Sequence, residues 1–208
     1  MGGGGAQMTE GWFWSHPEWL AFARAKGGES DVHVGAANLV VRLGSEGAMW
    51  NAVRKGHRAD IKAAKRDGVV VIEASNVAGF SVYARIHSAV AKKPRPNASY
   101  RAQRRSVLSG NARVFVAIVD GVAEVGAAYF YVYEHGSYYA SAARTDDAPR
   151  GVAHALVWAA MVALSVDRDW LDMGPEPKPT DSEKDEAIAH FKRGFGAESI
   201  KDWRFVLP

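Results

Sequence analysis

A strand, a helix and a second strand follow one another between Ser137 and Met173, and this order constrains the fold more than any other feature. The residue pattern predicts a strand at 137–141, a helix at 149–166 and a strand at 170–173. Asp146 or Asp147, in the loop at 142–147, is placed to cap the helix. The helix crosses between the two strands, which can then pair in parallel, because parallel pairing needs such a crossover.

A second helix follows a Pro-rich loop and ends in the sequence FKRGFG at 191–196. Ser182 and Asp185 have the spacing of a capping box, with Asp in the place of Glu. At the other end, Gly194 is expected in the left-handed conformation that closes many helices. The Lys and Arg are favourable near a helix C-terminus, and the two phenylalanines are expected in the core. Taken alone, FKRGFG therefore indicates a helix ending.

The rest of the chain completes an α/β (α+β) prediction, with a mixed, mostly antiparallel sheet flanked by helices. Strands are expected at 38–43, 69–74, 113–119, 122–133 and 200–206, and helices at 12–26, 49–66, 80–92 and 100–108. Asp120 and Gly121 form a strong hairpin-turn signal. The sequence contains no repeat and no domain-scale linker. We therefore expect a flexible Gly-rich tail at 1–10 and one domain at 11–208.

The composition excludes several classes of protein. There is no cysteine, hence no disulfide, thiolate nucleophile or cysteine metal site, and the seven histidines show no metal-binding spacing. No apolar run approaches the ~20 residues of a membrane span. The first residues lack the charged start and apolar stretch of a signal peptide. A cytoplasmic protein with no bound metal is expected.

Positive charge is unevenly distributed in a chain of formal net charge +3 and sequence pI of about 9.1. Cations cluster at 54–66 and 92–105, which suits an anionic partner such as tRNA, DNA or a nucleotide. Two solvated helix faces would explain the same pattern equally well. In the first cluster, three- and four-residue steps predict a buried stripe of Trp50, Val53, His57, Ile61 and Ala64. Lys55, Arg58 and Lys62 lie off this stripe and are the candidate phosphate-binding residues.

The order of elements resembles one enzyme family. A tyrosine-rich strand, a loop with Arg, a helix, a strand with Asp-x-Gly at 172–174 and a helix closed by FKRGFG resemble the FemABX-type acyltransferases. These are branched relatives of the GNAT N-acyltransferases. The basic segment 53–65 also resembles a helix of that family, so the resemblance covers roughly Trp50 to Pro208. It implies a short, single-domain GNAT-like form, with a remnant N-terminal helix and strand at 11–48 and a Fem-like core at 49–208.

The family also implies an active site. Its motif lysine, here Lys192, is implied to lie near the scissile ester and the developing oxyanion, with Phe191 packing beside it. GNAT folds bind substrate where two parallel strands splay, which here corresponds to 138–141, including Tyr139, and 171–173. Asp172 ends the second of these strands. It is a candidate general base, with a purely structural role in binding loop amides as the alternative.

Other general-base candidates are Glu134, His135 and His154, of which His154 is expected to be a core histidine and His135 to face solvent. A free amine acceptor needs little help from a base, so the chemistry does not depend on finding one.

The donor substrate is left open by the sequence. GNAT enzymes that bind coenzyme A resemble one another in a loop with the pattern Gln/Arg-x-x-Gly-x-Gly/Ala at a helix start. Gly151 and Ala153 match this pattern, whereas Ala148 replaces its first residue. Arg144, Arg150 and Gly151 at this helix start are therefore the candidate residues for binding the phosphate of a donor substrate. Fem-type enzymes instead use aminoacyl-tRNA, which suits the cationic helices.

We therefore expect an N-acyltransferase with no tightly bound cofactor, whose donor is aminoacyl-tRNA or, alternatively, acyl-CoA. The acceptor is a small-molecule or peptide amine, which the sequence does not identify. A non-catalytic nucleic-acid-binding module is the alternative from another class.

Overall fold

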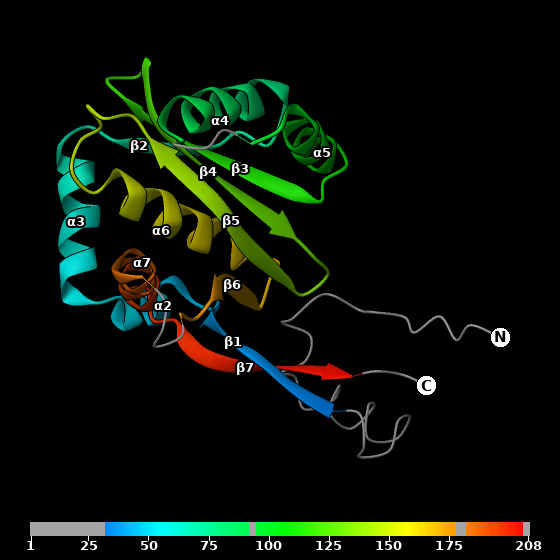
Figure 1. Ribbon diagram of the computed structural model, residues 1–208. Coiled ribbons are helices and arrows are strands. Elements are labelled where there is room, and N and C mark those ends of the chain that lie inside the picture. Colours follow the sequence, from blue (N-terminus) through cyan, green and yellow to red (C-terminus); the bar gives the residue numbers. More distant parts are fainter. Residues whose placement is uncertain (1–31, 92–94, 178–181, 206–208) are drawn as a thin grey trace.

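One seven-stranded sheet organises the molecule in the computed structural model, which describes residues 32–91, 95–177 and 182–205 (Figure 1). The strand order is β2-β3-β4-β5-β6-β1-β7. The strands are β1 (Val32–Arg42), β2 (Val70–Glu73), β3 (Ala112–Val119), β4 (Ala123–Val132), β5 (Gly136–Arg144), β6 (Trp170–Pro175) and β7 (Glu198–Phe205). The helices are α2 (Glu46–Ala52), α3 (Lys55–Arg66), α4 (Val77–Val90), α5 (Asn97–Leu108), α6 (Val152–Leu164) and α7 (Glu183–Arg193).

The sheet is mixed and mostly antiparallel, as the sequence predicted. Only β5 and β6 pair in parallel within the described sheet, and α6 connects them. β3 and β4 are joined at Asp120 and Gly121, both with positive φ, which confirms the predicted hairpin turn. This arrangement places the parallel pair in the interior of the sheet, with antiparallel neighbours β4 and β1 on either side.

Two hydrophobic clusters cover opposite faces of the sheet. Successive side chains of a strand point to opposite faces, so Phe115 and Ala117 of β3 belong to one cluster, while Val114 and Val116 belong to the other. The first cluster packs against α3 and α6, and the second packs against α4 and α5 (Figure 1). The core therefore consists of two layers, and α7 lies on the α3–α6 side through Ala189.

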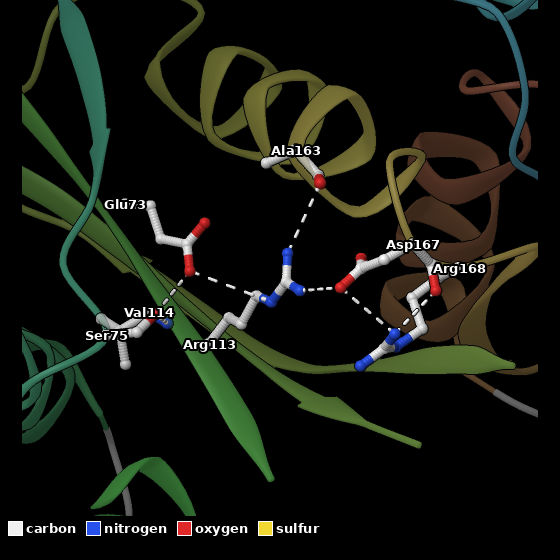
Figure 2. A network of polar contacts seen from close by, with 7 residues as sticks. All are labelled: Glu73, Ser75, Arg113, Val114, Ala163, Asp167 and Arg168. Carbon is white, nitrogen blue, oxygen red and sulfur yellow. Dashed lines mark hydrogen bonds and ion pairs between the residues drawn. The ribbon is translucent and has the colours of Figure 1, made fainter. Parts of the chain in front are cut away.

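Arg113 of β3 ties the end of α6 to the sheet edge. Its guanidinium donates to the carbonyl oxygen of Ala163 and forms ion pairs with Asp167 and, at 3.9 Å, with Glu73 (Figure 2). Asp167 also pairs with Arg168. These contacts fix the chain where it leaves α6 and turns into β6, so they help to hold β6 in the sheet.

The predicted helix at 49–66 is wrong as a single element, because the structure has two helices, α2 and α3. The break falls at Val53 and Arg54, where the amide of Arg54 donates to the carbonyl oxygen of Gly194 at 2.8 Å. This contact draws the chain toward the end of α7 and interrupts the helix. The buried stripe is nevertheless confirmed, since Val53, His57, Ile61 and Ala64 are buried and Trp50 is half-buried.

The start of the crossover helix also differs from the prediction. α6 begins at Val152, with Gly151 as its N-cap and no side-chain cap, so neither Asp146 nor Asp147 caps it. The preceding strand is longer than expected and continues to Arg144, because this residue still pairs with Gly126 of β4. Part of the predicted loop at 142–147 is therefore strand.

The end of α7 corrects another expectation. Gly194 has φ −64° and is not left-handed, whereas Gly196 has φ +83°. Glycine is needed at 194 for a different reason: a Cβ there would lie 2.0 Å from Nε2 of His57. The predicted capping box of Ser182 and Asp185 is present.

Several predictions concern segments outside the described residues. The Gly-rich tail and the helix at 12–26 fall there, as does Val206 at the end of the last predicted strand. Among the helices that the structure does describe, none is long and apolar enough to cross a membrane. In α4, Phe80, Tyr83 and Ile86 are buried, whereas Val90 is 41% exposed.

Candidate active site

The parallel strands β5 and β6 part after a short paired stretch. They pair from Gly136 opposite Trp170 to Tyr138 opposite Asp172, and no further pair follows along these two described strands. A cavity of about 540 Å³ lies where they diverge. It is lined by Tyr138, Tyr139, Ala140, Ser141, Ala142, Met173, Lys184, Ala187, Ile188, Phe191 and Lys192. The opening lies in the region that the family resemblance implied, between 138–141 and 171–173.

Residues from both faces of the sheet line this cavity. Tyr139 lies on the α6–α7 face, where its ring is 5.3 Å from that of Phe130. Tyr138 and Ser141 lie on the other face, opposite Tyr131 and Tyr129 of β4. Two substrates can therefore meet at the opening from opposite sides of the sheet.

Lys192 brings a cationic nitrogen to the opening. Burial lowers the pKa of its ammonium group, and the nearby carboxylate of Asp172 opposes that shift. Its Nζ atom is so close to Gly174 that a Cβ on this glycine would lie 3.2 Å away. Gly174 has φ +92°, a conformation that favours glycine, and this lets the backbone of β6 approach the lysine.

Asp172 is held in place beside this lysine. Its side chain is nearly buried, Oδ1 accepts a hydrogen bond of 2.6 Å from the amide of Gly174, and Oδ2 accepts one of 3.1 Å from Asn38. Burial, and secondly the charge of Asp172, raise the pKa of the Tyr138 hydroxyl. The alternative role of binding a loop amide is thus present. Asp172 occupies the last paired position of β6 before the strands part, but it does not line the cavity.

His57 of α3 supports the end of α7, a role that the sequence reasoning missed. Its Nε2 donates a hydrogen bond of 2.8 Å to the carbonyl oxygen of Phe191, which directly precedes Lys192. Its ring lies 4.5 Å from that of His154 and 4.9 Å from that of Phe195. Burial is the largest cause that lowers the pKa of His57, which favours the neutral ring. In the sequence, the glycine at position 194 was the signal that could have indicated a close contact at the end of α7, because its missing side chain makes room for the His57 ring.

The residues predicted to bind a phosphate at the start of α6 lie elsewhere. None of Arg144, Arg150 and Gly151 lines the cavity. Nε of Arg150 pairs with the Asp60 carboxylate at 2.7 Å, and a Cβ on Gly151 would lie 2.1 Å from the backbone oxygen of Asp60. Arg144 is exposed and donates to the carbonyl oxygen of Thr145. The start of α6 therefore packs against α3.

The predicted phosphate-binding residues of the basic segment differ in their surroundings. Arg58 is half-buried and donates to the carbonyl oxygen of Trp50 at the end of α2. Lys62 is exposed and places its ammonium 5.9 Å from the centre of the Trp50 ring. Lys55 is exposed. Local contacts therefore account for Arg58 and partly for Lys62, whereas Lys55 faces solvent.

The other candidate bases lie outside the cavity lining. Glu134 and His135 form a turn, and their side chains are 82% and 61% exposed, as predicted for His135. His154 is packed among rings, and burial lowers its pKa to about 4, which keeps it neutral. Its Nε2 lies 3.6 Å from Oδ2 of Asp60. Across the described residues, no group of His, Asp and Glu is arranged to hold a metal ion.

The fold is similar to that of FemX and of two other solved structures. FemX superposes with a TM-score of 0.68 at 12% identity, over 92% of this chain and 69% of FemX. L-PGS from Bacillus licheniformis superposes with a TM-score of 0.60 at 12% identity, over 91% of this chain and 65% of the L-PGS chain. The C-terminal domain of a putative lysylphosphatidylglycerol synthetase from Agrobacterium fabrum gives 0.58 at 16% identity, over 92% and 65%.

These comparisons show a FemX-like fold, in agreement with the sequence resemblance. The chain spans 65% of the length of the L-PGS chain and of the Agrobacterium fabrum domain, which is slightly less than two thirds, and 69% of the length of FemX. No protein-family model and no curated protein matches the sequence.

Proposed function

We propose that this chain is an N-acyltransferase that moves an aminoacyl group from aminoacyl-tRNA to a primary amine of a small molecule or peptide. The observation that carries the proposal is the amino group of Lys192, held at the β5–β6 opening next to Gly174 and within electrostatic reach of Asp172. Three acyltransferase-type folds as neighbours support the same class of reaction.

In the proposed reaction the acceptor amine attacks the carbonyl carbon of the ester that links the aminoacyl group to tRNA. A carbon–nitrogen bond forms and negative charge develops on the carbonyl oxygen, to which Lys192 donates a hydrogen bond. The carbon–oxygen bond then breaks. The proton lost by the amine passes through Asp172 to the leaving tRNA hydroxyl. Unpaired backbone groups of the parted strands are available to hold an extended substrate.

The surroundings of α6 support aminoacyl-tRNA over acyl-CoA as the donor. A pyrophosphate bound at the start of α6 would lie beside the carboxylate of Asp60, which already pairs with Arg150. The negative charges of the pyrophosphate and of Asp60 would repel each other. In addition, the backbone of Asp60 packs against Gly151, so α3 covers the start of α6. Exposed cations such as Lys55 suit the phosphate backbone of a nucleic acid. Because aminoacyl-tRNA is cytoplasmic, the proposed reaction takes place in the cytoplasm.

The first experiment replaces Lys192 with Met. Loss of one donor to a developing oxyanion typically lowers kcat by about 10²–10³, so turnover should nearly vanish. The thermal midpoint should stay within a few degrees, because Lys192 near a helix C-terminus contributes only about 0.3–1 kcal/mol to stability. A variant that kept more than about half of the kcat would show that the site is elsewhere.

Arg193→Met is the matched control, because it removes the neighbouring cation outside the cavity lining. Arg193 pairs with Glu176 at 2.7 Å and with Glu186 at 3.8 Å. Its replacement should cost some stability and leave most of the turnover, which is the reverse of the pattern expected for Lys192.

The donor is tested by binding and by chemistry. Binding of tRNA that weakens steeply with salt, without calorimetric binding of coenzyme A, would support the proposed donor, and the opposite result would support acyl-CoA. Deacylation of charged tRNA that depends on added amine separates an enzyme from a non-catalytic nucleic-acid-binding module. Salt-dependent tRNA binding without such deacylation would favour the module.

A further inference from the structure

A polar cluster on the α4–α5 face of the sheet borders the cavity and is not used by the proposed chemistry. Its centre is the hydroxyl of Tyr83, which lies 2.6 Å from Oγ of Ser141, 3.4 Å from a guanidinium nitrogen of Arg95 and 3.4 Å from Nε2 of Gln103. Ser141 also lines the cavity. The cluster therefore connects the inner side of α4 and α5 with the opening between β5 and β6.

The hydrogen bonds within this cluster define the direction of each proton. Arg95 and the Gln103 amide nitrogen are donors only, so the Tyr83 oxygen accepts from both. The single proton of Tyr83 must then be donated to Ser141. The hydroxyl proton of Ser141 remains available for an acceptor in the cavity that it lines. Ser141 is thus a hydrogen-bond donor directed by Tyr83.

Arg95 adds a positive charge to the same face. It is half-buried, and no carboxylate of the described residues lies within ion-pair distance of it. Its neighbours are aromatic or polar. Burial, and secondly the charge of Arg95, lower the pKa of His87, and the same charge counteracts the burial that raises the pKa of Tyr100 and Tyr138. A partly buried guanidinium normally pairs with an anion, because desolvating an unpaired charge is costly.

Gln103 shows that the cluster is not completed by its own groups. This side chain is 3% exposed, and its Oε1 has no hydrogen-bond partner among the residues that the structure describes. Buried polar atoms are usually satisfied, and a functional role or a bound water or ion is among the explanations for an exception. An incompletely satisfied network next to a cavity is therefore consistent with a binding role rather than a purely structural one.

We propose that Arg95 and Ser141 bind an oxyanionic group, a carboxylate or a phosphate, on the acceptor amine. This inference rests on the proposed function and specifies its substrate class: an amine that also carries an acidic group. The acceptor enters on the α4–α5 face, its acidic group pairs with Arg95 and accepts a hydrogen bond from Ser141, and its amine reaches the opening. Guanidinium and oxyanion form charge-assisted hydrogen bonds, which are stronger than neutral ones.

The test compares three amines with the same carbon chain: 3-aminopropanoate, 3-aminopropyl phosphate and 3-aminopropanol, which carries no acidic group. Binding to the full chain is measured by NMR titration without any donor. At least one of the two amines with an acidic group should bind about 10- to 100-fold more tightly than 3-aminopropanol, as expected for hydrogen bonds to a charged group. The tighter of the two anions identifies the group as carboxylate or phosphate.

Arg95→Gln should remove this preference and leave binding of 3-aminopropanol unchanged. Arg104→Gln is the matched control, because it removes an exposed cation from α5 with the same change in charge. Ser141→Ala should weaken anion binding less than Arg95→Gln. Equal binding of all three amines by the unaltered chain would overturn the inference, as would equal losses in the Arg95 and Arg104 variants.

Because binding is measured without a donor, the result does not depend on turnover. Anion binding that requires Arg95 in a chain that transfers no acyl group would sustain this inference and reject the proposed function. In an active chain, Arg95→Gln should raise KM for the anionic amine about 10- to 100-fold while kcat changes little.

Discussion

Replacing Gly194 with Ala tests how α3 supports the end of α7. Gly194 has helical φ and ψ, so Ala without other effects would stabilise the chain by about 0.5–1 kcal/mol. The added Cβ would however lie 2.0 Å from Nε2 and 2.2 Å from Cε1 of His57. This ring cannot move aside freely, because Phe195 and His154 pack against it and its Nε2 donates to the Phe191 carbonyl.

The expected loss combines two terms. Overpacking a core typically costs about 1–3 kcal/mol, and a broken hydrogen bond about 0.5–1.5 kcal/mol. The sum is roughly 2–4 kcal/mol, and for a chain of this size 1 kcal/mol corresponds to about 2–4 °C in thermal midpoint. We therefore expect Gly194→Ala to lower the midpoint by about 5–15 °C. It should also reduce turnover, because Lys192 follows the displaced Phe191 carbonyl.

A double-mutant cycle with His57→Ala isolates the contact. Without the imidazole ring, the added methyl group of Gly194→Ala has space, so the double variant should be about 2 kcal/mol more stable than the sum of the single effects indicates. Chemical denaturation measures all four free energies of unfolding. Additive effects, or a Gly194→Ala variant that is more stable than the parent chain, would refute this account of the α3–α7 contact.

Three further predictions concern α3 and the start of α6. The folded-state pKa of His154, about 4, lies below its unfolded value of 6.5, so the stability linked to the neutral ring is present above pH 6.5 and is lost on acidification toward pH 4. In His154→Phe the free energy of unfolding, measured by denaturation at several pH values, should therefore fall by roughly 3 kcal/mol less over this range. Lys55→Gln combined with Lys62→Gln should reduce the slope of log K against log salt for tRNA binding by up to about one per lost phosphate contact, and an unchanged slope would mean that these side chains are only solvated. Adding Arg58→Gln should also lower the stability of the chain, because Arg58 donates a hydrogen bond to the Trp50 carbonyl of α2. Arg150→Ala should leave KM for aminoacyl-tRNA unchanged, and an increase would indicate a phosphate at the start of α6.

Much of the fold could be predicted from local pattern. The strand–helix–strand order at 137–173 indicated a parallel pair, and the Asp120–Gly121 turn indicated the β3–β4 hairpin. The capping box of Ser182 and Asp185 and the buried stripe of α3 were likewise readable. These features depend on periodicity and on the backbone preferences of single residues, which the sequence contains directly.

The sequence by itself placed Lys192, Asp172 and Tyr139 in one region through a family resemblance. In the structure Lys192 and Tyr139 line the cavity, and Asp172 lies at the last paired position of β6, within electrostatic reach of Lys192. The catalytic roles of these residues stay predictions.

Only the tertiary structure decided which groups are occupied by partners distant in the chain. Arg150 was expected to be free for a phosphate, yet it pairs with Asp60, 90 residues away. Gly194 was read as a left-handed helix end, but its role comes from the ring of His57, which no local pattern connects to it. The cluster of Arg95, Tyr83 and Ser141 likewise forms only when α4 packs on β5. Propensity and periodicity act over a few residues, whereas ion pairing, steric exclusion and proton direction depend on which distant side chains the folded chain brings together.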